Sequence, residues 1–317
     1  MLLLLAVTIW PGWLNAILIS KKAFFSGLFN GLTVAGLYFV VAAGFTLIFG
    51  LMRNVNLAHG SLYLLGAYIG YEIAHRTGNW LFGAIGAFVF VAVVGAGLQV
   101  AVFKRLEGND LQQTLVSIGI SIVAADLMLW AWGGQTYQIE IPELIRGVVS
   151  LPIVSAIRGN GDPAYLTYPL YRIFVLGLAI IVGLSLWFML AKTRIGMMVR
   201  AGVDDREMLS ATGVRVQSVF IAVFALGAGL AGFAGMIGGS ALSISPGEDL
   251  RYLLASLVVV IVGGMGSIAG AAIGAVLVGL TEQLGLIYFP TYSTVLTFLI
   301  MIVTLTVRPQ GLMGRVT

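Results

Sequence analysis

Long apolar runs separated by short polar connections dominate this chain. A helix needs about 20 residues to cross a hydrocarbon core of about 30 Å. Ten segments approach or exceed that length: 2–19, 24–49, 57–74, 80–103, 115–132, 169–190, 216–239, 250–264, 268–289 and 292–307. The runs do not alternate with period two, and backbone groups in lipid need internal hydrogen bonds, so helices are favoured over a barrel. The pattern predicts an all-α polytopic transmembrane bundle of nine or ten spans.

Two of these segments differ from the others. Pro11, Gly12 and Asn15 interrupt the first, so residues 1–22 are predicted as an extra transmembrane helix or an uncleaved signal-like segment. The segment 250–264 is short and runs into a Gly-Gly-Met-Gly-Ser sequence, which is typical of a half-helix, a re-entrant element or one limb of a broken helix. Residues 23–317 are predicted to form one domain.

Composition narrows the function classes. The chain has 317 residues, of which 59% are hydrophobic and 9% charged, and its mean hydropathy is +1.03. Soluble domains carry about 25% charged residues, so a water-soluble enzyme is excluded. The net charge of +4 comes from basic residues between apolar runs, where topology and lipid headgroups account for it and nucleic acid binding is not implied.

Recognisable catalytic chemistry is scarce. There is no cysteine, which excludes disulfides and thiolate metal sites, and there are only two histidines, with no HExxH pattern. No Ser/His/Asp pattern and no Gly-Lys-Ser/Thr phosphate loop is present. We therefore predict that the chain is not an enzyme and binds no cofactor or metal itself, and that any ATP hydrolysis takes place in partner subunits.

The basic residues of the connections predict an orientation. Ten of the 17 Lys and Arg residues fall on one side of the predicted spans and seven on the other. By the positive-inside rule, the connection around 192–215 and the C-terminus are predicted to be cytoplasmic. The polar connection 133–168 is predicted to be extracytoplasmic.

Glycines recur at the spacing of helix contacts. Small residues four apart lie on one face of a helix and let two backbones approach closely, which favours helix packing in lipid. The pattern occurs in four places: Gly27 with Gly31, Gly66 with Gly70, Gly235 with Gly239, and Gly266 with Gly270 and Gly274. We interpret these glycines as packing positions and not as a nucleotide site.

The connection 192–215 holds eight of the 30 formal charges. Asp204 or Asp205 can cap a helix start, 206–212 is a good short helix, and Gly213 stands where a C-terminal left-handed residue belongs. This pattern predicts a short amphipathic helix at the cytoplasmic face that presents Met208, Leu209 and Ala211. A solvated positive-inside loop is the alternative.

Carboxylates inside predicted spans are a second group of candidates, because buried ionisable groups in a membrane are expensive and usually functional. Asp126 and Glu282 are the deepest, with no basic residue predicted as a counterpart, and Glu72 lies nearer a helix end. Either carboxylate could serve an ion-coupled porter. Each could equally hydrogen-bond Ser, Thr or Gln across a helix contact.

Several separated motifs carry a family resemblance. The stretch EMLSATG at 207–213, between two spans, resembles the coupling loop of bacterial ABC importer permeases. NGLTVAGLY at 30–38, GFTLIFGLMRNVNLAHGS at 44–61 and LGAY at 65–68 are joined by GGMGSIAGA at 263–271 and RPQGL at 308–312. Together these resemble the LivH/LivM branched-chain amino-acid permease family, most closely its LivH half, from about residue 24 onward.

The resemblance implies a heteromeric ABC importer in the bacterial inner membrane. Its other parts would be a second, LivM-like permease, two cytoplasmic ATPases that bind ATP and Mg²⁺, and a periplasmic binding protein that delivers the solute. The implied coupling residues are Asp204, Asp205, Arg206, Glu207, Met208, Leu209, Ala211 and Gly213.

The translocation path is a further expectation. The candidate lining residues are Tyr38, Asn56, His59, Ser61, Tyr63, Tyr68, Asp126 and Glu282. As an alternative, the tyrosines belong to the aromatic belt at the membrane interface, and Asn56 and His59 cap or pin a helix start.

The sequence is compatible with three functions. The first is a permease for a hydrophobic amino acid, with relatives suggesting aromatic or other organic acids, amides or urea as alternative solutes. The second, from a different class, is an ion-coupled secondary transporter that uses Asp126 or Glu282. The third, a membrane scaffold, fits the glycines but not the coupling-like loop.

Overall fold

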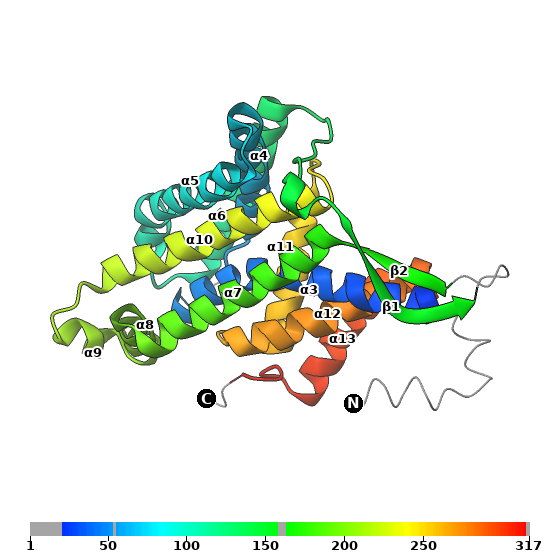
Figure 1. The fold of residues 1–317 in the computed structure, drawn as a ribbon. Helices are drawn as coiled ribbons and strands as arrows, with labels where there is room; N and C mark the ends of the chain where they lie inside the picture. Colours follow the sequence, from blue (N-terminus) through cyan, green and yellow to red (C-terminus); the bar gives the residue numbers. More distant parts are fainter. Residues whose placement is uncertain (1–20, 53–54, 158–162, 315–317) are drawn as a thin grey trace.

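The computed structural model describes residues 21–52, 55–157 and 163–314 (Figure 1). The predicted apolar segment 2–19 lies outside these residues. The α-helices are α3 (Lys21–Met52), α4 (His59–Thr77), α5 (Trp80–Ala101), α6 (Asp110–Trp132), α7 (Leu170–Lys192), α8 (Arg194–Asp204), α9 (Arg206–Ala211), α10 (Val216–Ala241), α11 (Glu248–Gly263), α12 (Ile268–Tyr288) and α13 (Ser293–Val307). The remaining elements are the short 3-10 turns η1 (Phe103–Leu106), η2 (Glu143–Ile145) and η3 (Pro290–Tyr292), and the strands β1 (Val148–Ile157) and β2 (Pro163–Pro169).

The helical bundle confirms the predicted fold class. Within the described residues, seven helices are long and apolar enough to cross a membrane. Each predicted apolar segment from 24–49 onward corresponds to a helix. The helices α4 and α11 are not among the seven, and α11, at 16 residues, is shorter than a full span.

A β-hairpin occupies part of the connection that was predicted only as a polar loop. Strands β1 and β2 are antiparallel, with Val148 opposite Pro169 and Leu151 opposite Leu166. The Tyr168 hydroxyl donates to the Phe29 carbonyl at 2.8 Å, which ties the base of the hairpin to the first part of α3. Figure 1 shows the hairpin beside the beginning of α3. We call this the hairpin end of the bundle.

The opposite end carries α8 and α9 (Figure 1). Met313, near the C-terminus, lines the same cavity as Val199 and Arg200 of α8. The connection 192–215 and the C-terminal residues therefore share one end, and the connection 133–168 lies at the other, as the charge pattern predicts. We call the former the α8–α9 end.

Helices α3 and α10 form the centre of the bundle. Their close contact depends on glycine: a Cβ atom added at Gly44 of α3 would lie 2.4 Å from the Gly227 carbonyl oxygen of α10. Similarly, a Cβ at Gly66 of α4 would lie 2.2 Å from Cα of Gly232. No side chain fits at such distances, so these residues let the backbones touch, and the predicted packing role of the glycines is confirmed at Gly66.

Candidate functional site

Helix α4 begins inside the bundle and not at its surface. The side chain of His59, its first residue, is fully buried, and Nε2 donates to the Val41 carbonyl at 3.0 Å. Val41 precedes the end of α3 by 11 residues, which is about 16 Å of helix. The chain therefore places a helix N-terminus, with its free N–H groups and positive dipole end, near the middle of α3.

The first turn of α11 meets the first turn of α4. A Cβ at Gly60 would lie 2.1 Å from the Asp249 carbonyl oxygen, so the two backbones are in contact. Ser61 Oγ lies 2.9 Å from Ser121 Oγ and 3.4 Å from Asp249 Oδ2. The first turns of α4 and α11 are thus in contact, and hydroxyl and carboxylate groups lie at the junction.

Asp249 was missed by the sequence reading. Its side chain is buried at 8% exposure, whereas Asp126, which was predicted to be deep, is exposed on α6. The negative carboxylate of Asp249 faces the positive end of α4, a favourable arrangement. One signal was available: Asp249 lies two residues after Gly247, directly before a short apolar segment.

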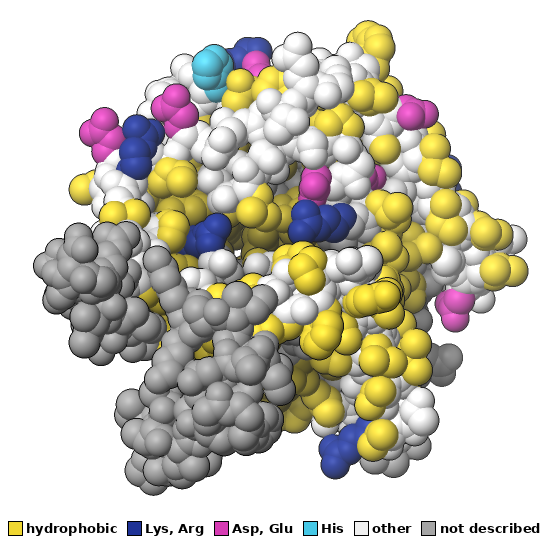
Figure 2. All heavy atoms as spheres, turned by 90° about the vertical axis from the view of Figure 1, so that its right-hand side faces the viewer, with side chains coloured by type: hydrophobic (Ala, Val, Ile, Leu, Met, Phe, Trp, Pro, Cys, Tyr) yellow, Lys and Arg dark blue, Asp and Glu magenta, His cyan; other side chains and the backbone are white. Residues whose placement is uncertain are grey.

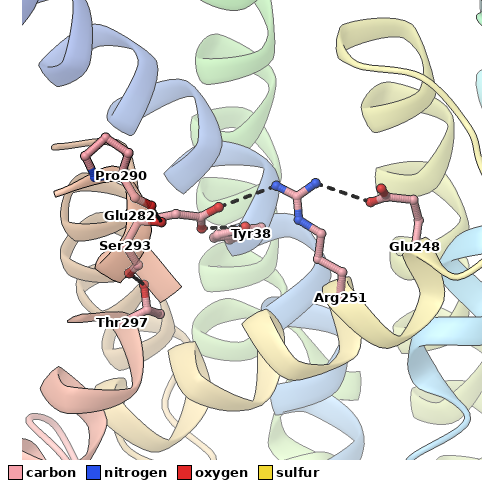
Figure 3. A network of polar contacts seen from close by, with 7 residues as sticks. All are labelled: Tyr38, Glu248, Arg251, Glu282, Pro290, Ser293 and Thr297. Atoms are coloured by element: carbon pink, nitrogen blue, oxygen red, sulfur yellow. Dashed lines mark hydrogen bonds and ion pairs between the residues drawn. The ribbon is translucent and has the colours of Figure 1, made fainter. Parts of the chain in front are cut away.

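A charged network extends from the same turn of α11 (Figure 3). Arg251 Nη1 lies 3.5 Å from Glu248 Oε2, and Nη2 lies 3.4 Å from Glu282 Oε1 on α12. The Tyr38 hydroxyl of α3 donates to Glu282 Oε2 at 2.7 Å. The expectation that Glu282 has no basic counterpart is therefore wrong. Arg251 lies 31 residues away in sequence, and only the contact between α11 and α12 brings the two together.

Aromatic rings adjoin this network. Tyr252 stacks on Tyr63, with ring centroids 4.0 Å apart, and meets Tyr38 edge-on at 6.0 Å. All three tyrosines are buried. The structure therefore brings together three predicted path residues, Tyr38, Tyr63 and Glu282, around residues of α11 that were not predicted.

Other predicted path residues lie elsewhere. Tyr68 stacks on Trp132 with centroids 4.8 Å apart, away from the charged network. Asn56 Oδ1 accepts a hydrogen bond from the Ala58 backbone N–H at 3.1 Å, directly before α4. The contacts of Asn56 and His59 match the alternative reading, in which they cap and pin the start of this helix.

Two cavities flank Arg251 towards the hairpin end. One, of about 130 Å³, is lined by Tyr38, Glu282 and Thr297 among others. The second, of about 100 Å³, lies between α3 and α7 and also touches Arg251. Figure 2 views this end of the molecule and shows a hollow with basic side chains on two sides and an acidic group nearby. The cavities are large enough for several water molecules or a small polar group.

At the α8–α9 end, the predicted short helix is present. Helix α9 spans Arg206–Ala211, and Asp205 Oδ1 accepts from the Met208 backbone N–H at 3.0 Å, so Asp205 is the capping residue. Gly213 has φ of 84°, the predicted left-handed conformation. Helix α8 was not predicted. Thr193 is the N-cap residue of α8, and its Oγ1 accepts a hydrogen bond from the Gly196 N–H at 3.2 Å.

The predicted coupling residues of α9 do not share one face. Met208 is 68% exposed and Ala211 is exposed, whereas Leu209 is buried. A Cβ at Gly202 would lie 3.2 Å from Leu209 Cδ2 and 3.3 Å from Leu51 Cδ1, so Leu209 packs near Leu51 at the end of α3. The expectation that Leu209 is presented outward is wrong. The side chains of Asp204, Arg206 and Glu207 lie outside the described part of the structure.

A larger cavity opens at this end. It measures about 840 Å³ and is lined by residues of α3, α8, the Gly-rich turn before α12 and the C-terminal segment, including Thr46, Arg200, Ser267 and Met313. Cavities thus occur along the first half of α3 and at its end, and the buried tyrosines of the charged network lie between these two places.

Comparison with known proteins places these features in a family context. The family model described as "Branched-chain amino acid transport system / permease component" matches residues 27–305. The permease protein LivH of a high-affinity branched-chain amino acid transport system in Salmonella typhimurium is 27% identical, over 92% of this chain and 96% of that protein. The corresponding BraD of Pseudomonas aeruginosa is 28% identical, over 91% and 95%. The ribose import permease RbsC of Escherichia coli is 26% identical, over 84% and 80%.

Proposed function

Because the chain belongs to the branched-chain amino acid ABC transporter permease family, we propose that it is a membrane subunit of an ATP-driven importer in a bacterial inner membrane. The solute proposed is a hydrophobic or branched-chain amino acid delivered by a periplasmic binding protein. The proposed partners are a second permease and two cytoplasmic ATPases, which bind ATP and Mg²⁺.

The observation that carries this proposal is the construction of the α8–α9 end. A capped six-residue helix, with Met208 exposed and Leu209 packed near the end of α3, is suited to receive force from outside and pass it to the bundle. An ATPase docked on α9 would push through Leu209 against Gly202 of α8, which in turn lies beside Leu51 of α3. A loop solvated on all sides would have no such contact.

The solute path proposed here follows α3 past the start of α11. Cavities along the first half of α3 and at its end provide the outer and inner parts, and the stacked Tyr63 and Tyr252, with Tyr38, form the closed section between them. Movement of α3 relative to α11 would separate these rings. In this arrangement the network of Glu282 and Arg251 holds the outer side closed until the ATPases act.

Substitution of Gly213 tests the coupling role. In the complete transporter, reconstituted in vesicles with its binding protein, we expect Gly213→Val to lower ATP-driven uptake at least tenfold, because the left-handed backbone after α9 is strained by any side chain with Cβ. Membrane insertion should be unchanged. Gly108→Val is the matched control, since Gly108 has φ of 87° and open space around it.

Two results would contradict the proposal. Uptake at the wild-type rate in Gly213→Val would remove the coupling role. Uptake that proceeds without any ATPase subunit would overturn the importer itself.

A further inference from the structure

Arg172 has an unusual environment for a basic residue in this bundle. It lies in the first turn of α7, partly buried, and its guanidinium donates to Asn30 Oδ1 of α3. The Tyr168 ring lies 5.8 Å from the guanidinium carbon. Among the described residues, no carboxylate lies within ion-pair distance of Arg172.

Arg251 lies on the same cavity and provides the contrast. Two carboxylates, Glu248 and Glu282, already pair with it. A charged group in a low-dielectric site is costly unless an opposite charge compensates it. Arg172 is therefore the cation of this cavity whose charge is available to an anion.

Neighbouring groups hold Arg172 in place. The Thr33 hydroxyl lies 2.7 Å from the Tyr168 hydroxyl and 3.4 Å from the Arg172 carbonyl oxygen. Tyr168 in turn is bound to the Phe29 carbonyl. The base of the hairpin, α3 and α7 thus fix the position of the guanidinium, and such preorganisation favours binding of a small planar anion.

The cavity beside Arg172 has two chemically distinct parts. Its polar lining comes from Asn30, Thr33, Gln283 and the two arginines. Its apolar lining comes from Val34, Leu37, Val175, Ala241 and Leu242. A site of about 100 Å³ is smaller than a pocket that encloses a whole ligand, so with one available cation and an aliphatic wall it takes up a carboxylate and part of a short branched carbon chain.

We propose that this cavity is an outer subsite that binds the carboxylate of the incoming solute through Arg172 and its aliphatic part against Val34, Leu37 and Val175. The inference rests on the proposed importer function and adds the residue that determines selectivity for a carboxylate at the hairpin end. Arg251, paired with its two glutamates, forms the opposite wall.

Binding without transport provides the first test. The purified permease complex, without binding protein, is titrated with 4-methylpentanoate and with 4-methylpentanamide, which differ in the charged group, and thermal unfolding is recorded. We expect the carboxylate to raise the Tm and the amide to have at most a tenth of its apparent affinity. The shift should be lost in Arg172→Gln and partly retained in Arg172→Lys, because lysine keeps the charge but not the bidentate geometry.

The matched control is Arg146→Gln. Arg146 lies at the same end of the molecule, is exposed and pairs with Glu140 at 3.9 Å, outside the cavity. This variant should keep the wild-type carboxylate response. Equal responses to carboxylate and amide in the wild-type protein, or a full response in Arg172→Gln, would overturn the subsite.

Transport provides the second test and separates the subsite from the proposed function. With saturating binding protein, we expect Arg172→Gln to lower the kcat of leucine uptake at least tenfold, with KM for the loaded binding protein and basal ATP hydrolysis unchanged. A purely structural role would lower the Tm and the yield of complex as well. Wild-type kcat in Arg172→Gln would refute the subsite alone, whereas absence of ATP-driven uptake in the wild-type transporter would refute the function alone.

Discussion

Helices α3 and α6 have similar apolar sequences but opposite positions in the bundle. In the most apolar stretch of α3, 83% of the residues are buried within the protein, whereas in that of α6 only 11% are buried. Gly31 and Gly44 of α3 lie against the backbones of α12 and α10. Gly119, the only glycine of α6, has no atom near the position of a Cβ. Hydropathy therefore identifies a membrane helix, and the placement of small residues decides whether protein or lipid surrounds it.

The polar groups of the inner helices and of α6 also differ in their surroundings. Tyr38 and Glu282, on α3 and α12, take part in a network around the start of α11. Asp126, on α6, is exposed and outside it. The inner helices hold the buried polar and charged groups, and α6 has an exposed apolar face.

Replacing glycine with valine should have the largest effect, and only where the glycine lies in a helix contact. A Cβ at Gly235 of α10 would lie 1.9 Å from the Tyr63 carbonyl oxygen, which forces α4 and α10 apart. Overpacking typically costs about 1–3 kcal/mol, and a backbone clash exceeds that range. We expect Gly235→Val to abolish monodisperse protein in size-exclusion chromatography, while Gly119→Val elutes like wild type. Equal behaviour of the two variants would show that glycine contacts do not decide position.

Carboxylate neutralisation should have the next largest effect. Glu282→Gln leaves Arg251 with one carboxylate partner and weakens the closed outer side, so we expect ATP-driven uptake to fall about tenfold, because the charge of the partly buried Arg251 is then less compensated. Asp126→Asn should stay within about twofold of wild type, because an exposed group away from the network contributes little.

This pair also tests the other transporter class. Gradient-driven uptake in vesicles without ATP or ATPase subunits, abolished by Asp126→Asn, would support ion coupling through that carboxylate and contradict the importer.

Two tryptophans of α6 provide the test with the smallest expected effect, because one contacts α4 and the other is exposed. Trp132 stacks on Tyr68 of α4, whereas Trp130 is 87% exposed. Aromatic stacking contributes about 0.5–1.5 kcal/mol beyond the burial of area. We expect Trp132→Ala to lower the Tm by several degrees, at about 2–4 °C per kcal/mol, and Trp130→Ala to leave it unchanged. The reverse order in thermal unfolding would mean that α6 packs through its other face.

The positions of the described helices could be predicted, but their depth could not. Apolar length places α4 within a few residues of its observed bounds, yet the start of α4 beside Val41 depends on the His59 contact. The hairpin escaped prediction because a polar connection carries no strong period. Helix α8 escaped because a charged segment between spans is compatible with a loop.

Whether a feature of the site could be predicted depended on how far apart in sequence the interacting residues are. Local signals sufficed for Asp205 and Gly213, because a cap and a left-handed residue act within one turn. They did not suffice for Glu282, whose partners Arg251 and Tyr38 come from two other helices. Nor did they distinguish Leu209, which is buried, from its neighbour Met208, which is exposed.

By itself, the sequence determined that lipid surrounds the chain, which segments are helical, which glycines sit at contact spacing, and which motifs resemble a permease family. These are properties of composition and short-range periodicity. Only the tertiary structure decided that the first turns of α4 and α11 touch, that Asp249 is buried and Asp126 exposed, and that Arg251 is paired while Arg172 is free of a carboxylate among the described residues. The physical reason is that burial and charge pairing depend on which helices touch, and residues far apart in sequence make those contacts.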